Sequence, residues 1–487
     1  MGAVSVKEWM QNVIKPEQIE KYKDNGKDFI NETHINELLL KKRQPEKQEI
    51  RDIMAKSLNL ERLEPEETAA LLNCTDEDLW QEMYQTGLQI KQKVYGRRIV
   101  TFAPLYISNY CVNSCVYCGF RGNNEQSIRQ HLTMDELREE IKALVQKGHK
   151  RLIMVYGEHP KSDAHYIAET LKVAYSTKVG HGEIRRSNVN AAPMSIEDLE
   201  ILRDVGIGTF QVFQETYHHN TYKKLHPRGI KADYGWRLYA LHRAMDAGVD
   251  DVGIGALFGL YDWKFEVLGL LFHTIDLEKK FAGVGPHTIS FPRLEPAVNT
   301  PFIENNSYKI DDETFKKLVT VIRLSVPYTG MILTARENPS IRQDVIQVGC
   351  TQIDAGANIA IGGYSKGSVD YERQQFILGD NRSLDAAIRD MAKLGYITSF
   401  CTAGYRCGRT GSYFMEIAKK GKVHHLCMPN AILTFKEYLL DYASPETIEV
   451  GEKLIQNEFE ALPNDLVKKQ VTEFLRRIEA GERDLFL

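Results

Sequence analysis

The sequence predicts an α/β fold: a (βα)8 TIM-type barrel with helical segments before and after it. From about residue 98, short apolar runs alternate with helical patterns at intervals of roughly 30 residues, as repeated βα units do. Eight such runs occur, which is the number that closes a barrel. An open, doubly wound sheet is the alternative, but no G-x-G-x-x-G follows the first run, which counts against its dinucleotide-binding form.

The predicted strands are short and rich in apolar residues, and helical patterns separate them. Two of the helices carry start signals: Thr133 with Glu136 forms a capping box, and Ser195 with Asp198 forms a weaker version. The eight predicted strands are RIVTFAPLYIS (98–108), KRLIMVYG (150–157), EIRRSNVN (183–190), GTFQVFQE (208–215), DVGIGALFG (251–259), HTISFPRL (287–294), GMILTARE (330–337) and VIQVGCTQID (345–354).

The segments on either side of the barrel have different compositions. Residues 1–95 show periodic Leu and Ile among Lys and Glu, which predicts an N-terminal extension of amphipathic helices. The barrel is expected over 96–385. Residues 386–487 begin with a stretch rich in Gly, Cys and Arg and continue in helical patterns, so we expect a separate, mostly helical domain there.

Bulk composition is typical of a soluble globular enzyme, with 43% hydrophobic and 26% charged residues. The formal net charge of −4, from 62 Lys and Arg against 66 Asp and Glu, gives no reason to expect nucleic acid or an anionic membrane as a partner. No stretch offers the roughly 20 apolar residues of a membrane span, and no signal peptide pattern opens the chain. We therefore expect a cytoplasmic protein.

Three of the eight cysteines, Cys111, Cys115 and Cys118, fall in one loop after the first predicted strand, spaced C-x3-C-x2-C. In a barrel that position is the C-terminal face, where active sites lie. A structural zinc site usually has four protein ligands. A 4Fe–4S cluster that is bound by three thiolates has one iron left open to bind another molecule. A zinc knuckle or a chance grouping are the alternatives.

This spacing, with the aromatic Tyr117 before the last cysteine, resembles the signature of radical S-adenosylmethionine (SAM) enzymes. The resemblance implies a radical SAM barrel in which SAM chelates the open iron and is cleaved reductively to a 5′-deoxyadenosyl radical. Gly157 and Glu158 resemble the family motif that holds the SAM amine. Arg237 and the GIGAL run from Gly253 to Leu257, with its glycines Gly253 and Gly255, resemble the parts that hold its carboxylate and adenosine. Without the cysteine loop, Glu158 would be read as a solvent-facing acid and Arg237 as a solvated helix residue.

Longer stretches resemble the tyrosine lyases among the radical SAM enzymes. They are FQETYHHNTYKKLHP, KADYGWRLYALHRAMDAGVDDVGIGALFGL, GVGPHTISFPRLEPA and TQIDAGANIAIGGY. The resemblance implies cleavage of the Cα–Cβ bond of L-tyrosine to p-cresol and dehydroglycine. It also implies an electron donor such as ferredoxin or flavodoxin. In the hydrogenase-maturation branch, which the chain length and the C-terminal extension favour, a second cluster converts dehydroglycine to carbon monoxide and cyanide for the FeFe-hydrogenase, and maturation proteins are partners.

Two arginines at predicted strand ends, Arg293 and Arg336, could hold the substrate carboxylate, because a guanidinium donates two parallel bonds to it. The alternative is an ion pair with a nearby acid such as Glu295 or Glu337.

The C-terminal segment departs from the pattern of that branch, in which C-x2-C-x22-C binds the second cluster. Cys401 and Cys427 match its first and third positions, but Gly404 stands at the second and cannot ligate iron. Cys407 could substitute if the loop is rearranged; otherwise Cys401, Cys407 and Cys427 are simply packed thiols.

A second departure is Asp276, at a position where this branch has a histidine linked to the second cluster. His424 and His425 adjoin Cys427 and could offer a nitrogen ligand, although solvated histidines are the commoner case. Cys74 and Cys350, the latter within the last predicted strand, are expected to be buried structural thiols.

These departures leave three functional readings open. The chain is a tyrosine lyase that also makes carbon monoxide and cyanide, or a tyrosine lyase that releases dehydroglycine or glyoxylate without making carbon monoxide. The third reading is a non-enzymatic iron–sulfur carrier or scaffold, which would have no need to bind SAM.

Overall fold

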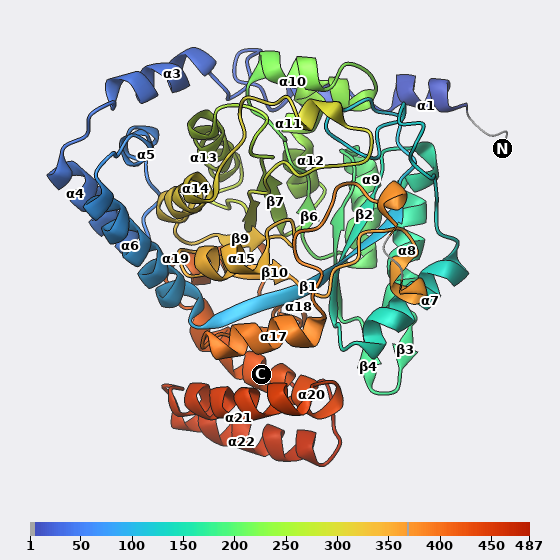
Figure 1. The fold of residues 1–487 in the computed structure, drawn as a ribbon, viewed down its shortest axis with the longest axis vertical. Coiled ribbons are helices and arrows are strands. Elements are labelled where there is room, and N and C mark those ends of the chain that lie inside the picture. The colour runs from blue at the N-terminus through green and yellow to red at the C-terminus, as the bar shows by residue number, and fades with distance from the viewer. Residues whose placement is uncertain (1–4, 368–369) are drawn as a thin grey trace.

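The computed structural model describes residues 5–367 and 370–487 and contains a closed barrel of eight parallel strands (Figure 1). Consecutive barrel strands pair in chain order, and β10 returns to pair with β1 through Val100 and Gln352. This closure confirms the predicted barrel over the open sheet. The barrel strands are β1 (Arg98–Ser108), β2 (Arg151–Tyr156), β5 (Arg186–Asn190), β6 (Phe210–Gln211), β7 (Val252–Gly255), β8 (Thr288–Ser290), β9 (Gly330–Leu333) and β10 (Gln352–Asp354).

Helices follow the strands and surround the barrel (Figure 1). The capping box at Thr133 forms: its hydroxyl accepts from the Glu136 amide at 3.2 Å, and its own amide donates to the Glu136 carboxylate at 2.8 Å. The helices between strands are α7 (Met134–Gln146), α8 (Ala164–Ser176), α9 (Ile196–Val205), α10 (His219–Leu225), α11 (Tyr234–Leu238), α12 (Ala240–Asp246), α13 (Trp263–Lys280), α14 (Asp312–Ser325) and α15 (Pro339–Ile346). A small hairpin, β3 (Lys178–Val179) with β4 (Gly182–Glu183), lies outside the barrel.

The N-terminal segment is helical, as the periodic Leu and Ile predict. Figure 1 shows α3 to α6 along one side of the barrel, where α6 lies against α14 and Ser57 of α4 donates to the Leu324 carbonyl at 2.9 Å. These helices are α1 (Val6–Asn12), α2 (Glu17–Glu20), α3 (Glu32–Lys41), α4 (Lys47–Leu58), α5 (Pro65–Leu72) and α6 (Glu77–Tyr95).

The C-terminal segment adds one more strand to the sheet. Strand β11 (Ile397–Ser399) pairs with the first residues of β1, so Val100 has Gln352 on one side and Ser399 on the other. Helices α20 to α22 form a layer below the barrel (Figure 1) with a smaller apolar core of its own. Helix α16 (Gly363–Lys366) follows β10 and packs against α7. The helices of the C-terminal segment are α17 (Leu384–Lys393), α18 (Ala403–Arg406), α19 (Gly411–Lys419), α20 (Val423–Asp441), α21 (Pro445–Glu460) and α22 (Asp465–Glu479).

The last predicted strand is wrong over most of its length. Helix α15 continues to Ile346, and β10 begins only at Gln352, so Cys350 precedes the strand rather than lying within it. The apolar run 345–350 is therefore a helix end and a turn, a distinction that a short apolar run does not reveal. Cys350 and Cys74 are both buried, as expected.

Among the described residues, no helix combines the length and the apolar character that crossing a bilayer requires.

Candidate functional site

The cysteine loop, residues 108–122, starts where β1 ends and lies at the C-terminal end of the barrel strands. Backbone bonds tie it to separate parts of the chain: the Val112 amide donates to the Glu158 carbonyl at 2.9 Å, and the Gly119 amide donates to the Gln375 carbonyl at 3.1 Å. A Cβ at Gly119 would lie 2.8 Å from a neighbouring backbone oxygen, so only glycine permits this approach.

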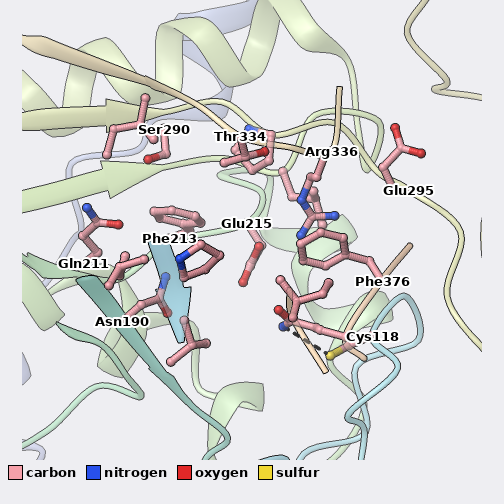
Figure 2. Close-up of a pocket in the computed structure, with 18 of the residues that line it drawn as sticks. Cys118, Asn190, Gln211, Phe213, Glu215, Ser290, Glu295, Thr334, Arg336 and Phe376 are labelled. Carbon is pink, nitrogen blue, oxygen red and sulfur yellow. Dashed lines mark hydrogen bonds between the residues drawn. The ribbon is translucent and has the colours of Figure 1, made fainter. Parts of the chain in front are cut away.

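The three cysteines of the loop differ in their exposure. Cys115 is buried, and Cys111 and Cys118 are partly exposed. An amide nitrogen lies near two of them: Asn113 Nδ2 is 3.5 Å from Cys111 Sγ, and Gln375 Nε2 is 3.6 Å from Cys118 Sγ, the dashed line in Figure 2. Burial raises the pKa of the Cys111 and Cys115 thiols, so their thiolate forms need a positively charged partner such as iron.

This loop fits an iron–sulfur cluster better than a single metal ion. Within residues 5–367 and 370–487, no three His, Cys, Asp or Glu side chains are grouped to hold one ion. A 4Fe–4S cluster is larger than one ion, takes only thiolates from the protein, and needs no fourth ligand where a second molecule binds the open iron.

Glu158, just after β2, faces the cysteine loop with one free oxygen. Its Oε2 accepts from Asn113 Nδ2 at 2.5 Å, whereas its buried Oε1 has no hydrogen-bond partner. Burial raises the pKa of Glu158, although the Asn113 bond opposes this. A Cβ at Gly157 would lie 2.3 Å from the Tyr110 carbonyl oxygen, so glycine is needed there. The orphaned oxygen suits a donor such as the SAM ammonium.

Arg237 shares a carboxylate with Lys231. Arg237 Nη2 lies 3.2 Å from Glu215 Oε1, and Lys231 Nζ lies 2.6 Å from the same oxygen. Burial alone would raise the pKa of Glu215, but the two cations outweigh it and hold that pKa below its usual value. Two cations against one carboxylate leave a net positive charge, which suits an anionic group of a bound molecule.

A cavity opens from the cysteine loop into the barrel (Figure 2). The space in it that admits a water molecule is about 140 Å³, and all the space between its protein atoms, including open solvent, is about 1060 Å³. Figure 2 shows Cys118, Arg336 and Phe376 close together on one side and Asn190, Gln211 and Ser290 on the other.

The two arginines predicted to hold a carboxylate differ sharply. Arg293 lies outside the cavity lining and is held by Glu337 and Asp312, the latter at 2.8 Å. Arg336 lines the cavity, and in the described part of the chain it has no ion pair. Its guanidinium lies 3.3 Å from the centre of the Phe376 ring. Arg336 is therefore available to bind an anion, and Arg293 is not.

The remaining residues that the sequence predicts for the site either line the cavity or pack behind its wall. Tyr117 lines the cavity, and its hydroxyl lies 2.7 Å from His226 Nε2. Gly253 and Gly255 of β7 do not line it. A Cβ at Gly255 would lie 2.6 Å from the ring of Phe213, so these glycines make room for side chains that do point inward.

A second, smaller pocket lies at the other end of β1, where Cys401 and Cys427 face it together with Gly404 and His287. Its other lining residues are mostly apolar. A Cβ at Gly404 would meet nothing nearer than Arg409 Cβ at 3.9 Å, so there is room for a larger side chain at that position.

Cys407 does not take the place of the missing thiol. It is exposed, is not part of the pocket lining, and its Sγ lies 3.8 Å from the Leu487 carbonyl oxygen. Contacts near the C-terminus hold this loop, including an Arg409 Nη2 bond to the same carbonyl at 2.8 Å. As placed, the residues do not fit a cluster bound by three thiolates.

The other residues considered for a second cluster, Asp276, His424 and His425, do not line this pocket. Asp276 accepts from His242 Nε2 at 2.7 Å and pairs with Lys280, away from the pocket. His424 and His425 line a different surface pocket.

The sequence did not single out two residues of these sites, Glu215 and His287. Glu215 has a left-handed backbone (φ 72°) and joins two cations, but a strand-end acid gives no such signal in sequence. His287 lines the second pocket and lies 3.1 Å from Asp251. It is the first residue of the predicted strand 287–294, and this was the one available clue in the sequence.

Comparisons with known proteins agree with this geometry. Residues 105–268 match the model of the radical SAM superfamily, and residues 290–397 match the biotin and thiamin synthesis associated domain. The 2-iminoacetate synthase of Salmonella typhimurium is 30% identical over 324 residues, 65% of this chain and 82% of that protein.

Two solved structures are similar over nearly the whole chain. A crystal structure of HydG, a maturase of the FeFe-hydrogenase, is 49% identical with a TM-score of 0.91, covering 95% of this chain and all of that one. HydG from Carboxydothermus hydrogenoformans is 37% identical with a TM-score of 0.79, covering 95% and 99%. The chain therefore belongs to the radical SAM superfamily, in the family that includes the HydG maturases and the 2-iminoacetate synthases.

Proposed function

We infer that this enzyme binds L-tyrosine beside its 4Fe–4S cluster and SAM, the cofactors of its superfamily, and cleaves the Cα–Cβ bond to p-cresol and dehydroglycine. The observation that carries this proposal is Arg336, whose guanidinium has no ion pair among the described residues and lines the cavity on the same side as Cys118 (Figure 2). When bound, the cluster and SAM supply the one-electron chemistry that removes a hydrogen atom from the substrate.

In this proposal the chain's own residues bind and orient the cluster, SAM and the substrate. Cys111, Cys115 and Cys118 would hold the cluster, and the free oxygen of Glu158 would accept from the SAM ammonium. Arg336 would hold the tyrosine carboxylate, so that the amino group faces the cysteine loop. The barrel wall around the cavity would limit the access of bulk water to a reactive site.

The test is an anaerobic incubation of the reconstituted protein with SAM, L-tyrosine and a chemical reductant, with every product counted. With L-tyrosine we expect the amount of p-cresol to rise in proportion to the amount of SAM cleaved. With tyramine we expect no p-cresol, because tyramine lacks the carboxylate that Arg336 would bind. SAM cleavage without p-cresol would assign the cavity to another substrate. An absence of SAM binding would favour an iron–sulfur carrier.

The affinity for tyrosine is expected to fall as pH rises through about 7. Burial, with repulsion from Glu337, raises the pKa of Glu295 to about 7, so this acid is mostly neutral below that pH. Above it, the ionised carboxylate competes with the substrate for Arg336. The KM for tyrosine should therefore increase several-fold between pH 6 and 8 in the wild type and stay level in Glu295→Gln.

A second candidate function is the lyase step alone, and Gly404 is the observation that favours it. The pocket at Cys401 and Cys427 offers two thiols where the HydG pattern has three, and Cys407 points elsewhere. The imine HN=CH–COO⁻ would then leave the enzyme and react with water to give glyoxylate and ammonia. The competing outcome is conversion to carbon monoxide and cyanide for hydrogenase assembly.

Gly404→Cys is expected to create a third thiol in the second pocket, because a Cβ there would meet no atom nearer than Arg409 Cβ at 3.9 Å. Iron and sulfide per chain should rise above the roughly four of each that one cluster supplies, while Cys407→Ser should leave them unchanged. If Cys407→Ser lowers the iron content of the wild type, the loop rearranges and Cys407 is a ligand after all.

A further inference from the structure

A group of exposed basic side chains lies beside the cysteine loop. Residues 223–231, KKLHPRGIK, which we call the basic segment, carry four cations and no acid in a chain whose formal net charge is −4. Lys231 is paired with Glu215. Lys223, Lys224 and Arg228 are exposed, and no ion pair holds any of them within the part of the chain that the structure describes.

The basic segment and the cysteine loop form one surface. The Ser114 amide donates to the Arg228 carbonyl at 3.1 Å, and the Val116 amide donates to the Leu225 carbonyl at 3.1 Å. Gly229 has a φ of 99°, and a Cβ there would lie 2.2 Å from a side-chain oxygen of the loop. The loop residues on either side of Cys115 are therefore bonded directly to the segment that carries the unpaired cations.

An apolar centre accompanies these charges. Val116 and Phe302 are half-buried and pack against the cluster of Cys115 and Leu225. An apolar centre with a charged rim is the usual anatomy of a protein interface, and transient electron-transfer complexes need only a small one.

We propose that this surface, the basic segment with Val116 and Phe302, docks an acidic one-electron donor protein. The proposal rests on the proposed function in one respect: the cysteine loop must hold a reducible cluster. One electron passes from the donor to that cluster, so the donor is oxidised and the cluster is reduced by one electron each, with no proton transfer required.

The positive charge of the basic segment would attract an acidic donor to this face. The net charge of the whole chain is negative, so an acidic protein is repelled on average, and three unpaired cations in one segment supply a local attraction. Complementary charge mainly raises the association rate and fixes the orientation of the encounter. Here the orientation brings the donor against the loop that carries Cys115.

The test uses the reconstituted full-length protein and a reduced, acidic, low-potential ferredoxin as the probe. Lys223→Glu/Lys224→Glu should slow cluster reduction by the ferredoxin by about tenfold at an ionic strength near 10 mM, where exposed charges act over roughly 30 Å. The same variant should bind oxidised ferredoxin about tenfold more weakly, a readout that needs no turnover. Both differences should shrink toward unity near 0.5 M salt.

Lys393→Glu/Lys469→Glu is the matched control. These lysines are also exposed and without ion pairs among the described residues, but they lie on α17 and α22, far from α10 (Figure 1). This variant makes the same change in net charge, so it should stay within about twofold of the wild type in both assays. Equal effects of the two double variants would show that only net charge matters and would overturn the proposal.

A small reductant separates this proposal from the proposed function. Photoreduced deazaflavin carries little charge, so it should reduce the wild type and both double variants at the same rate. If deazaflavin supports SAM cleavage but no p-cresol, the tyrosine assignment fails while the docking assays stand. If deazaflavin supports p-cresol formation and Lys223→Glu/Lys224→Glu still accepts electrons from ferredoxin at the wild-type rate, the docking surface is refuted.

The salt dependence of the unmodified enzyme gives an independent measurement. If its rate of reduction by ferredoxin does not change with salt concentration, the docking surface is also refuted.

Discussion

Replacing Cys118 by alanine is expected to abolish p-cresol formation and SAM cleavage together. Three thiolates from one loop are the minimum that holds a 4Fe–4S cluster with a single open iron, so losing one removes either the cluster or its ability to bind SAM. In the proposed function the other residues of the cavity would bind and orient the substrate but would supply no radical chemistry. Iron per chain, SAM cleavage and p-cresol should therefore all be measured on the same sample.

Cys407→Ser is the control for this result, because Cys407 is exposed and lies outside both pockets. It should form p-cresol at the wild-type rate. Persistent p-cresol formation by Cys118→Ala would mean that the catalytic cluster is held elsewhere, and the assignment of the cysteine loop would fall.

Replacing Arg336 by glutamine is expected to lower kcat/KM for L-tyrosine by about 10²-fold, which corresponds to about 3 kcal/mol for an unpaired, largely enclosed carboxylate. The guanidinium has no ion pair in the described structure, so the change breaks no internal contact of that kind and should leave the fold intact. SAM binding and the iron content should be unchanged, while the KM for tyrosine rises. Arg336→Lys should recover part of the loss, because charge is kept but the paired donors are not.

Arg293→Gln provides the contrast. Its side chain holds the buried Glu337, so removing it leaves that acid without its partner and should lower the melting temperature. We expect its KM for tyrosine to change far less than that of Arg336→Gln. If both variants lose the same kcat/KM at full stability, both arginines contact the substrate and the distinction drawn here is wrong.

The parts of this molecule that sequence predicts well are local. The cysteine loop places Cys111, Cys115 and Cys118 within eight residues, so the spacing alone carries their chemistry. The alternation of apolar runs and helical patterns likewise predicts the barrel, because each βα unit is encoded in a continuous stretch.

The parts that sequence could not resolve depend on contacts between distant segments. Arg293 and Arg336 look alike in sequence, and only the placement of Asp312 and Glu337 shows that Arg293 is ion-paired, whereas Arg336 has no ion pair among the described residues. The role of Glu215 depends on Lys231 and Arg237 converging on it. The last predicted strand failed for a different reason, since the run 345–350 has the apolar character of both a strand and a buried helix end.

The length of strand β1 bears on whether substitutions at its two ends have additive effects. Its 11 residues span roughly 33 Å, with Arg98 beside Cys401 at one end and the cysteine loop after the other. At that separation a unit charge changes the energy at the far end by only about 0.5 kcal/mol, even at an effective dielectric constant near 20. Free-energy changes measured for substitutions at Gly404 and at Arg336 should therefore simply add in the double variant, and a coupling energy well above that value would reveal a structural link between the two ends.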